Sequence, residues 1–143
     1  MNSKIRLEQV VFIPNELDQG VLYVSDRYNV AVHLCACGCE NKVTTPLGPA
    51  EWSFNNDDSG PTLYPSIGNW QIPCKSHYWI KDGEILWSYA WTEEQIERGR
   101  KNDQEKLEQY FKQRELPEIR PQEKEARKSF WVRIKDWILQ LFK

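Results

Sequence analysis

The chain has no excess of basic residues, no long apolar run and no opening segment typical of a secreted protein. Its 143 residues carry a formal net charge of −2 with both signs mixed, which argues against nucleic acid as a partner. No stretch approaches the roughly 18 consecutive apolar residues of a membrane span, so we expect that no segment crosses a membrane. The first residues, MNSKIRLEQVVFIPNELD, lack a signal-peptide core, and we therefore expect a cytoplasmic protein.

Cysteine is scarce but clustered. Three of the four cysteines alternate within CACGC, and the fourth lies in PCKSH. In a reducing compartment, such a cluster is more typical of metal binding or catalysis than of disulfides. Four thiolates are a common ligand set for structural zinc, and Gly38 permits the bend that lets neighbouring thiols reach one ion. We predict one Zn²⁺, bound by Cys35, Cys37, Cys39 and Cys74, with His33 or His77 as substitutes for Cys35.

A simpler interpretation treats the same thiols as small buried hydrophobes. Three cysteines at alternate positions around a glycine would fill a core poorly, so the metal interpretation is preferred. The spacing is not that of a standard CxxC pair, and it therefore indicates a metal site without identifying a known zinc finger.

Composition changes once along the chain and indicates three segments. Residues 1–92 hold all the cysteines and histidines, and stretches such as GVLYVS and NVAVHLC predict short strands. SHYWI-KDG-EILW predicts a hairpin with its turn at Asp82-Gly83. We expect a mainly β fold, a small zinc-stabilised antiparallel sheet, with a C-terminal helical extension. Residues 93–128 are predicted to form a charged helical or tether segment, capped by Thr92 and Gln95 and interrupted at Gly99.

If the four cysteines bind the metal, both histidines remain free, and histidine is the usual general base. Two serine–histidine pairs are therefore candidates for catalysis. Ser66 is the preferred nucleophile for His77, in a predicted tight turn fixed by Pro65 and Gly68. Asn69 is expected to orient a histidine or donate to an oxyanion. Neighbours on a strand point to opposite faces, so Ser76 and His77 should not pair with each other. Ser76 with His33 is the pairing held in reserve. From the residues alone, however, the favoured interpretation is that these serines cap turns and the histidines bind metal or pack among aromatic rings.

Three motifs together resemble a bacterial family catalogued as a domain of unknown function: VHLCACGC, PSIGNW and CKSHYWI. The resemblance covers roughly residues 20–91. One departure is Glu40, at a position where the family pattern suggests a second glycine after the cysteine motif. Members of the family are encoded beside bacterial ubiquitin-like proteins and enzymes resembling those that activate and conjugate ubiquitin.

The resemblance implies a role in ubiquitin-like modification, with a ubiquitin-like protein and its conjugating enzymes as partners. The preferred hypothesis is a serine-type peptidase with structural zinc that matures the modifier or removes it from targets. The alternative is a non-catalytic zinc adaptor that assists conjugation. A zinc-dependent hydrolase is a weaker third hypothesis, because catalytic zinc usually keeps three protein ligands and an open position.

The last segment, residues 129–143, predicts an amphipathic helix. Its apolar residues recur at helical spacing and form one stripe, which we expect to be covered by its own domain or by a second copy of the chain. A partner groove and a membrane surface are the alternatives. The stripe comprises Phe130, Trp131, Ile134, Trp137, Ile138 and Leu141.

Overall fold

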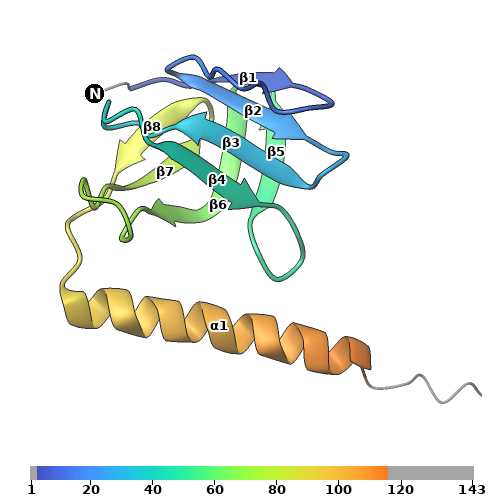
Figure 1. Cartoon of the computed structure of the whole chain (residues 1–143), viewed down its shortest axis with the longest axis vertical. Helices are drawn as coiled ribbons and strands as arrows, with labels where there is room; N and C mark the ends of the chain where they lie inside the picture. The colour runs from blue at the N-terminus through green and yellow to red at the C-terminus, as the bar shows by residue number, and fades with distance from the viewer. Residues whose placement is uncertain (1–2, 116–143) are drawn as a thin grey trace, which may run out of the picture. The chain divides into compact units, whose positions relative to one another are not determined.

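The computed structural model describes residues 3–115 and contains two four-stranded sheets followed by one helix (Figure 1). The predicted mainly β fold with a helical C-terminal extension is confirmed. The first sheet has the order β1-β2-β3-β4 and the second has the order β5-β6-β7-β8. The elements are β1 (Arg6–Gln9), β2 (Val21–Ser25), β3 (Val30–Leu34), β4 (Lys42–Pro46), β5 (Ser53–Asp57), β6 (Gly60–Gly68), β7 (His77–Lys81), β8 (Glu84–Trp87) and α1 (Glu93–Glu115).

Most strands pair with their neighbours in the sequence as antiparallel hairpins. The predicted hairpin of β7 and β8 is confirmed, and both turn residues, Asp82 and Gly83, have positive φ angles of 51° and 72°. Two such residues in succession are what a two-residue hairpin turn requires. The exception to the antiparallel pattern is β1, which runs parallel to β2.

The two sheets share one core. Strands of both sheets contribute buried apolar side chains to it, and Figure 1 shows the first sheet lying in front of the second. The side chains of β2 are buried at all five positions, so this strand is covered on both faces. The central members of the core are Leu22, Val24, Ala31, Cys35, Val43, Leu63, Ile67, Tyr78, Ile80 and Ile85.

The predicted tight turn at Pro65–Gly68 is wrong, because these residues lie within β6. The pairing of β6 with β7 shifts register between Leu63 and Ile67, and Pro65 lies in this irregular stretch. A residue without an N–H is tolerated in a strand at such irregularities. The longest strand described, β6, therefore runs through the predicted turn.

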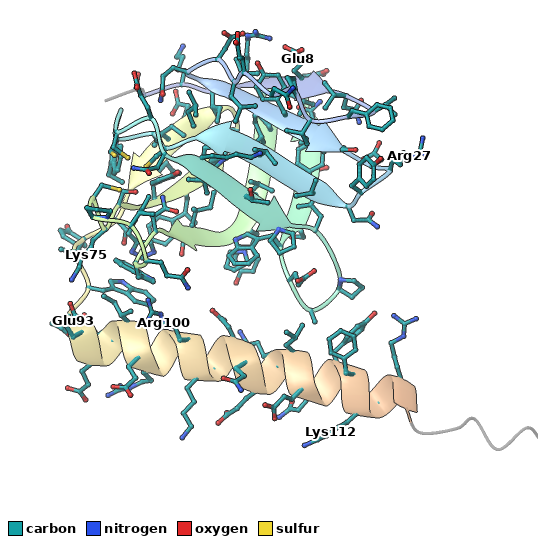
Figure 2. All side chains as sticks on the ribbon, in the orientation of Figure 1. Glu8, Arg27, Lys75, Glu93, Arg100 and Lys112 are labelled. Carbon is teal, nitrogen blue, oxygen red and sulfur yellow. The ribbon has the colours of Figure 1, made fainter. Side chains whose placement is uncertain are left out.

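The predicted capping box at the start of α1 is confirmed. Thr92 Oγ1 accepts a hydrogen bond from the Gln95 N–H at 3.3 Å, and Gln95 Oε1 accepts one from the Thr92 N–H at 2.9 Å. Lys75, in the connection between β6 and β7, lies beside Glu93 in Figure 2, with 2.6 Å between Nζ and Oε1. Residues up to Leu107 belong to one compact unit with the strands.

The predicted interruption of the helix at Gly99 is wrong, since α1 continues through it. A Cβ added at Gly99 would lie 3.0 Å from the ring of Trp91. Glycine therefore gives Trp91 room to lie against the helix backbone, which explains its presence without a break in the helix.

The predicted amphipathic helix over residues 129–143 lies outside the described residues. The proposed division into 1–92, 93–128 and 129–143 stays a prediction. No helix in the described range is long and apolar enough to cross a bilayer.

Candidate functional site

Ser66 and His77 come from neighbouring strands and meet side by side. His77 begins β7 and is paired with Gly68 of β6, which places it diagonally across from Ser66 on the same face. The distance between Ser66 Oγ and His77 Nε2 is 2.9 Å, a hydrogen bond. This is the contact through which a histidine can take a proton from a serine hydroxyl.

Tryptophan rings surround the imidazole of His77. The ring centroids of Trp91, Trp70 and Trp79 lie 4.7, 5.0 and 5.4 Å from that of His77. Burial lowers the pKa of His77 below its ordinary value, and the nearby backbone of Tyr89 acts in the opposite direction. The imidazole is therefore neutral at pH 7 and able to accept a proton.

No carboxylate of the described residues bonds to the second ring nitrogen of His77, since its Nδ1 has no hydrogen-bond partner there. The described site is thus a serine–histidine dyad. Asn69, which was predicted to orient a histidine or to donate to an oxyanion, forms no side-chain hydrogen bond with His77 in the described structure. Its amide Nδ2 donates instead to Ser76 Oγ at 2.8 Å and to Tyr78 OH at 3.4 Å.

Ser66 and His77 open into a cleft of about 490 Å³. Strand β4, the end of β6, the connection from β6 to β7, and the first turns of α1 line it. Trp52 also stands at this cleft and donates from Nε1 to the backbone oxygen of Ser66 at 3.3 Å. The remaining lining residues used below are Lys42, Val43, Thr44, Gly68, Trp70 and Trp91.

The reserve pair, Ser76 and His33, is not brought into contact. The Nε2 atom of His33 bonds to Tyr78 OH at 2.7 Å, and Ser76 Oγ lies 3.1 Å from Cys35 Sγ. Tyr78 and Asn69 connect the two, so all four side chains belong to one buried polar chain. Burial lowers the pKa of His33 to about 4, which keeps this ring neutral at pH 7.

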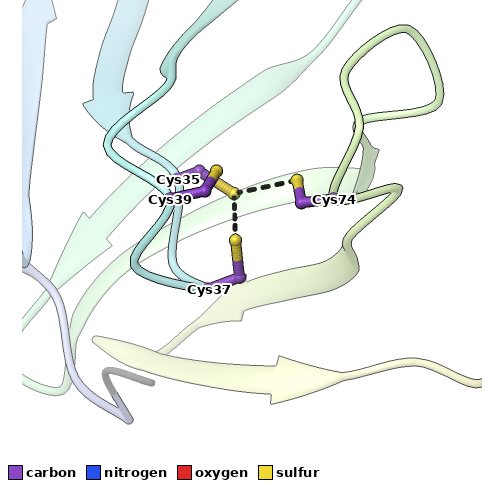
Figure 3. Close-up of side chains that lie close together, drawn as sticks. All are labelled: Cys35, Cys37, Cys39 and Cys74. Carbon is purple, nitrogen blue, oxygen red and sulfur yellow. Dashed lines mark hydrogen bonds between the residues drawn. The ribbon is translucent and has the colours of Figure 1, made fainter.

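The four cysteines converge at one place, as Figure 3 shows. Their sulfur atoms all lie within 4.8 Å of one another. Cys35 Sγ is 3.4 Å from Cys37 Sγ and 3.9 Å from Cys74 Sγ, and all four thiols are free. Sulfur atoms bound tetrahedrally at about 2.3 Å would be about 3.8 Å apart, so the cluster fits a metal ion of this kind. Neither histidine is a member of the cluster.

The backbone around the first three cysteines follows the predicted bend. Gly38 has a φ of 87° and Glu40 a φ of 59°, both in the left-handed region. The position where the family pattern suggested a second glycine therefore has a backbone that favours glycine.

Polar groups next to the sulfur atoms suit thiolates. Asn41 Nδ2 donates to Cys39 Sγ at 3.1 Å and lowers the pKa of Cys39 to about 6. Asn69 Nδ2 lies 3.6 Å from Cys35 Sγ, and the hydroxyl of Ser76 approaches the same sulfur. Donors of this kind orient metal ligands and favour their charged form.

Sequence reasoning missed the tryptophans around the site and the lining role of β4. Trp79 lies in the predicted hairpin beside His77, but only the fold brings Trp52, Trp70 and Trp91 to one cleft. The role of Gly68 was equally hidden in the sequence: only the fold shows that a Cβ at this position would clash with the ring of Trp70. Gly68 therefore has a packing role beside the candidate nucleophile.

A serine hydrogen-bonded to a neutral histidine in a tryptophan-lined cleft defines a candidate serine hydrolase site on a β-rich domain with a cysteine cluster. The family model described as bacterial ubiquitination-like system serine protease (BubE) matches residues 9–88, more than half of the chain. The chain belongs to this family, and the predicted resemblance is confirmed. Searches of curated proteins and of solved structures found no match.

Proposed function

We propose that this chain is a serine-type peptidase that cleaves at the C-terminal end of a ubiquitin-like modifier, either to mature a precursor or to release a conjugate. The observation that carries the proposal is the 2.9 Å contact between Ser66 Oγ and His77 Nε2 at the cleft. The family description supports the same chemistry and the same pathway.

In the proposed reaction Ser66 Oγ attacks the carbonyl carbon of the scissile bond while His77 Nε2 takes the hydroxyl proton. The imidazolium then gives this proton to the leaving amine, and an acyl-enzyme remains on Ser66. Water, deprotonated by His77, attacks the ester; the C–O bond to Ser66 then breaks, His77 returns the proton to Ser66 Oγ, and the new C-terminus is released. Burial by the tryptophans keeps His77 neutral before the first step.

Asn69 and Ser76 are proposed as positioning residues. Their hydrogen bond and their contacts with Cys35 connect the end of β6 to the cysteine cluster. Ser76 is buried and has no histidine partner, which favours Ser66 as the nucleophile. We propose zinc as the metal held by the four cysteines, in a closed structural role.

The test compares two serine variants with a fluorophosphonate probe and with the cognate ubiquitin-like precursor as substrate. Ser66→Ala should abolish labelling and lower cleavage by about 10³-fold or more. Ser76→Ala is the matched control and should still be labelled in its folded fraction. Labelling that persists in Ser66→Ala and disappears in Ser76→Ala would contradict the assignment.

A non-catalytic adaptor is the second candidate function. The exposed apolar side chains of the β7–β8 hairpin favour it, since Leu86 and Trp87 are 43% and 39% exposed. The adaptor hypothesis expects a stable complex with a conjugating enzyme that Trp87→Ala weakens. It also expects no cleavage and no labelling of Ser66, so the same experiments separate the two functions.

A further inference from the structure

The strand β4 has one open edge. Within residues 3–115 it is the last strand of the first sheet and pairs with β3 alone. An unpaired edge offers a row of backbone donors and acceptors to another extended chain. Here the edge belongs to the candidate site, because Lys42, Val43 and Thr44 line the same cleft as Ser66 and His77.

The hydrogen bonds at the two ends of β4 show which backbone groups are free. The Cys35 N–H donates to the Asn41 oxygen at 2.8 Å, and the Leu47 N–H donates to the Asn29 oxygen at 2.8 Å. In an antiparallel pair, alternate residues face the partner strand, so Val43 and Thr45 bond to β3. The N–H and C=O groups of Lys42 and Thr44 therefore face away from β3.

The end of the same edge is closed. Pro46 has the same orientation as Lys42 and Thr44, but it has no N–H, and its oxygen already accepts from the Trp52 N–H at 3.2 Å. The open stretch is therefore confined to Lys42 and Thr44, both exposed, beside the candidate nucleophile.

Gly68 adds a second free backbone to the same cleft. Strand β5 pairs with β6 only as far as Tyr64, so Gly68 has no strand partner on that side among the described residues. Gly68 pairs with His77 in register, while the Asn69 N–H donates to the Ser76 oxygen at 2.9 Å, which by alternation turns the Gly68 groups away from β7. Two strand edges thus stand at one cleft, which is typical of a site for extended peptide.

We infer that the substrate segment next to the scissile bond binds as an added strand on the outer edge of β4, pairing with the backbone of Lys42 and Thr44. The inference rests on the proposed peptidase function and adds how the substrate is held. Backbone pairing grips an extended tail of almost any sequence and presents its carbonyl groups at regular intervals. The bound segment is therefore an extended, unfolded tail of the substrate. Trp52, Trp70 and Trp91, which line the cleft, determine which side chains of this tail fit.

Thr44→Pro tests the outer N–H directly. Because this N–H makes no bond to β3, proline removes it without breaking the ladder, as Pro46 already does in the same strand. We expect kcat/KM on a synthetic peptide that spans the precursor's cleavage site to fall roughly tenfold or more. Hydrolysis of p-nitrophenyl acetate, which needs no strand, should fall much less than peptide cleavage. Thr44→Val is the matched comparison: it retains the N–H and the branched shape, so its loss in kcat/KM on the peptide should be far smaller than that of Thr44→Pro.

A second measurement leaves the protein intact and alters the peptide. Methylating one backbone nitrogen at a time should impair cleavage at every second position and spare the positions between. Losses without alternation would overturn the inference, as would unchanged kcat/KM for a folded Thr44→Pro.

The two proposals fail separately. Hydrogen exchange of Ser66→Ala with the same peptide needs no catalysis, and the Lys42 and Thr44 amides should become protected. Protection without cleavage by the wild-type chain would support the strand site and contradict the peptidase. Cleavage by the wild type without protection, in the presence of saturating peptide, would support the peptidase and contradict the strand site.

Discussion

His77 must be neutral to take a proton from Ser66, and its surroundings keep it so. Burial among tryptophans lowers its pKa, so the ring stays neutral to a lower pH than an exposed histidine does. Activity is present at pH values above the pKa of His77 in the folded protein, and it is lost as the pH falls through that pKa. We expect the acid limb of kcat/KM to have its midpoint below about 6.5, the ordinary histidine value.

A variant checks that burial is the cause. Trp91→Ala uncovers one side of the imidazole, so the midpoint should move up towards about 6.5 in pH–rate profiles of peptide cleavage. Tyr28→Ala removes an aromatic ring that contacts Phe12 instead of His77, and it should leave the midpoint in place. A wild-type midpoint at or above the ordinary value would contradict the argument.

Gly38 and Glu40 differ in how well each suits its backbone. Gly38→Ala places a side chain at a φ of 87° with no atom within 4 Å of the new Cβ, so the cost is conformational. We expect a loss of about 1–2 kcal/mol in the free energy of unfolding. Glu40→Gly relieves a φ of 59° and should not destabilise the protein. Urea denaturation of both variants measures this, and equal losses would contradict it.

At the scale of elements, β6 and β7 carry Ser66 and His77, and the polar chain of His33, Tyr78, Asn69 and Ser76 joins β7 to β3. Tyr78 on β7 gives His33 its hydrogen bond, while His33 Nδ1 has no partner within the described residues. Tyr78→Phe would leave this buried ring without any such bond. We expect a loss of about 1–3 kcal/mol in thermal or urea denaturation. Tyr64→Phe, at a residue 69% exposed, is the control and should change stability by less than about 0.5 kcal/mol.

Local sequence signals predicted the elements whose causes are local. The hairpin at Asp82-Gly83 and the capping box of Thr92 and Gln95 depend on residues a few positions apart, and both were predicted correctly. The extended run through Pro65 was missed, because strand pairing across a register shift depends on β7. Gly99 was misjudged because its reason is Trp91, which packs against it.

The same distinction holds for the whole molecule. The chemistry of the residues predicted Ser66 and His77 as partners and predicted that the four cysteines lie together. The sequence did not indicate that Asn69 bonds to Ser76 and Tyr78. The open edge of β4 beside the serine is a property of the two-sheet arrangement. No stretch of the chain taken alone contains that information, since it depends on which strands remain unpaired.

The cysteine cluster joins parts of the molecule that are far apart in the sequence. Cys35, Cys37 and Cys39 follow β3 of the first sheet, while Cys74 lies in the connection from β6 to β7, between Ser66 and His77. An ion held there would tie the two sheets together next to the candidate active site. Its loss should therefore reduce both stability and activity.

Metal removal tests this at the scale of the whole chain. Elemental analysis should find about one zinc per chain, as a four-thiolate site implies. Treatment with a chelator should lower the Tm and abolish fluorophosphonate labelling of Ser66, and added zinc should restore both. Cys74→Ala should reproduce the loss without chelator, whereas Ser66→Ala should keep its zinc and its Tm.

A metal-free protein that retains its Tm would show that the cluster does not stabilise the fold. Retained Tm with lost labelling would instead place the effect of the metal at the Ser66–His77 pair, through the Asn69 and Ser76 contacts with Cys35.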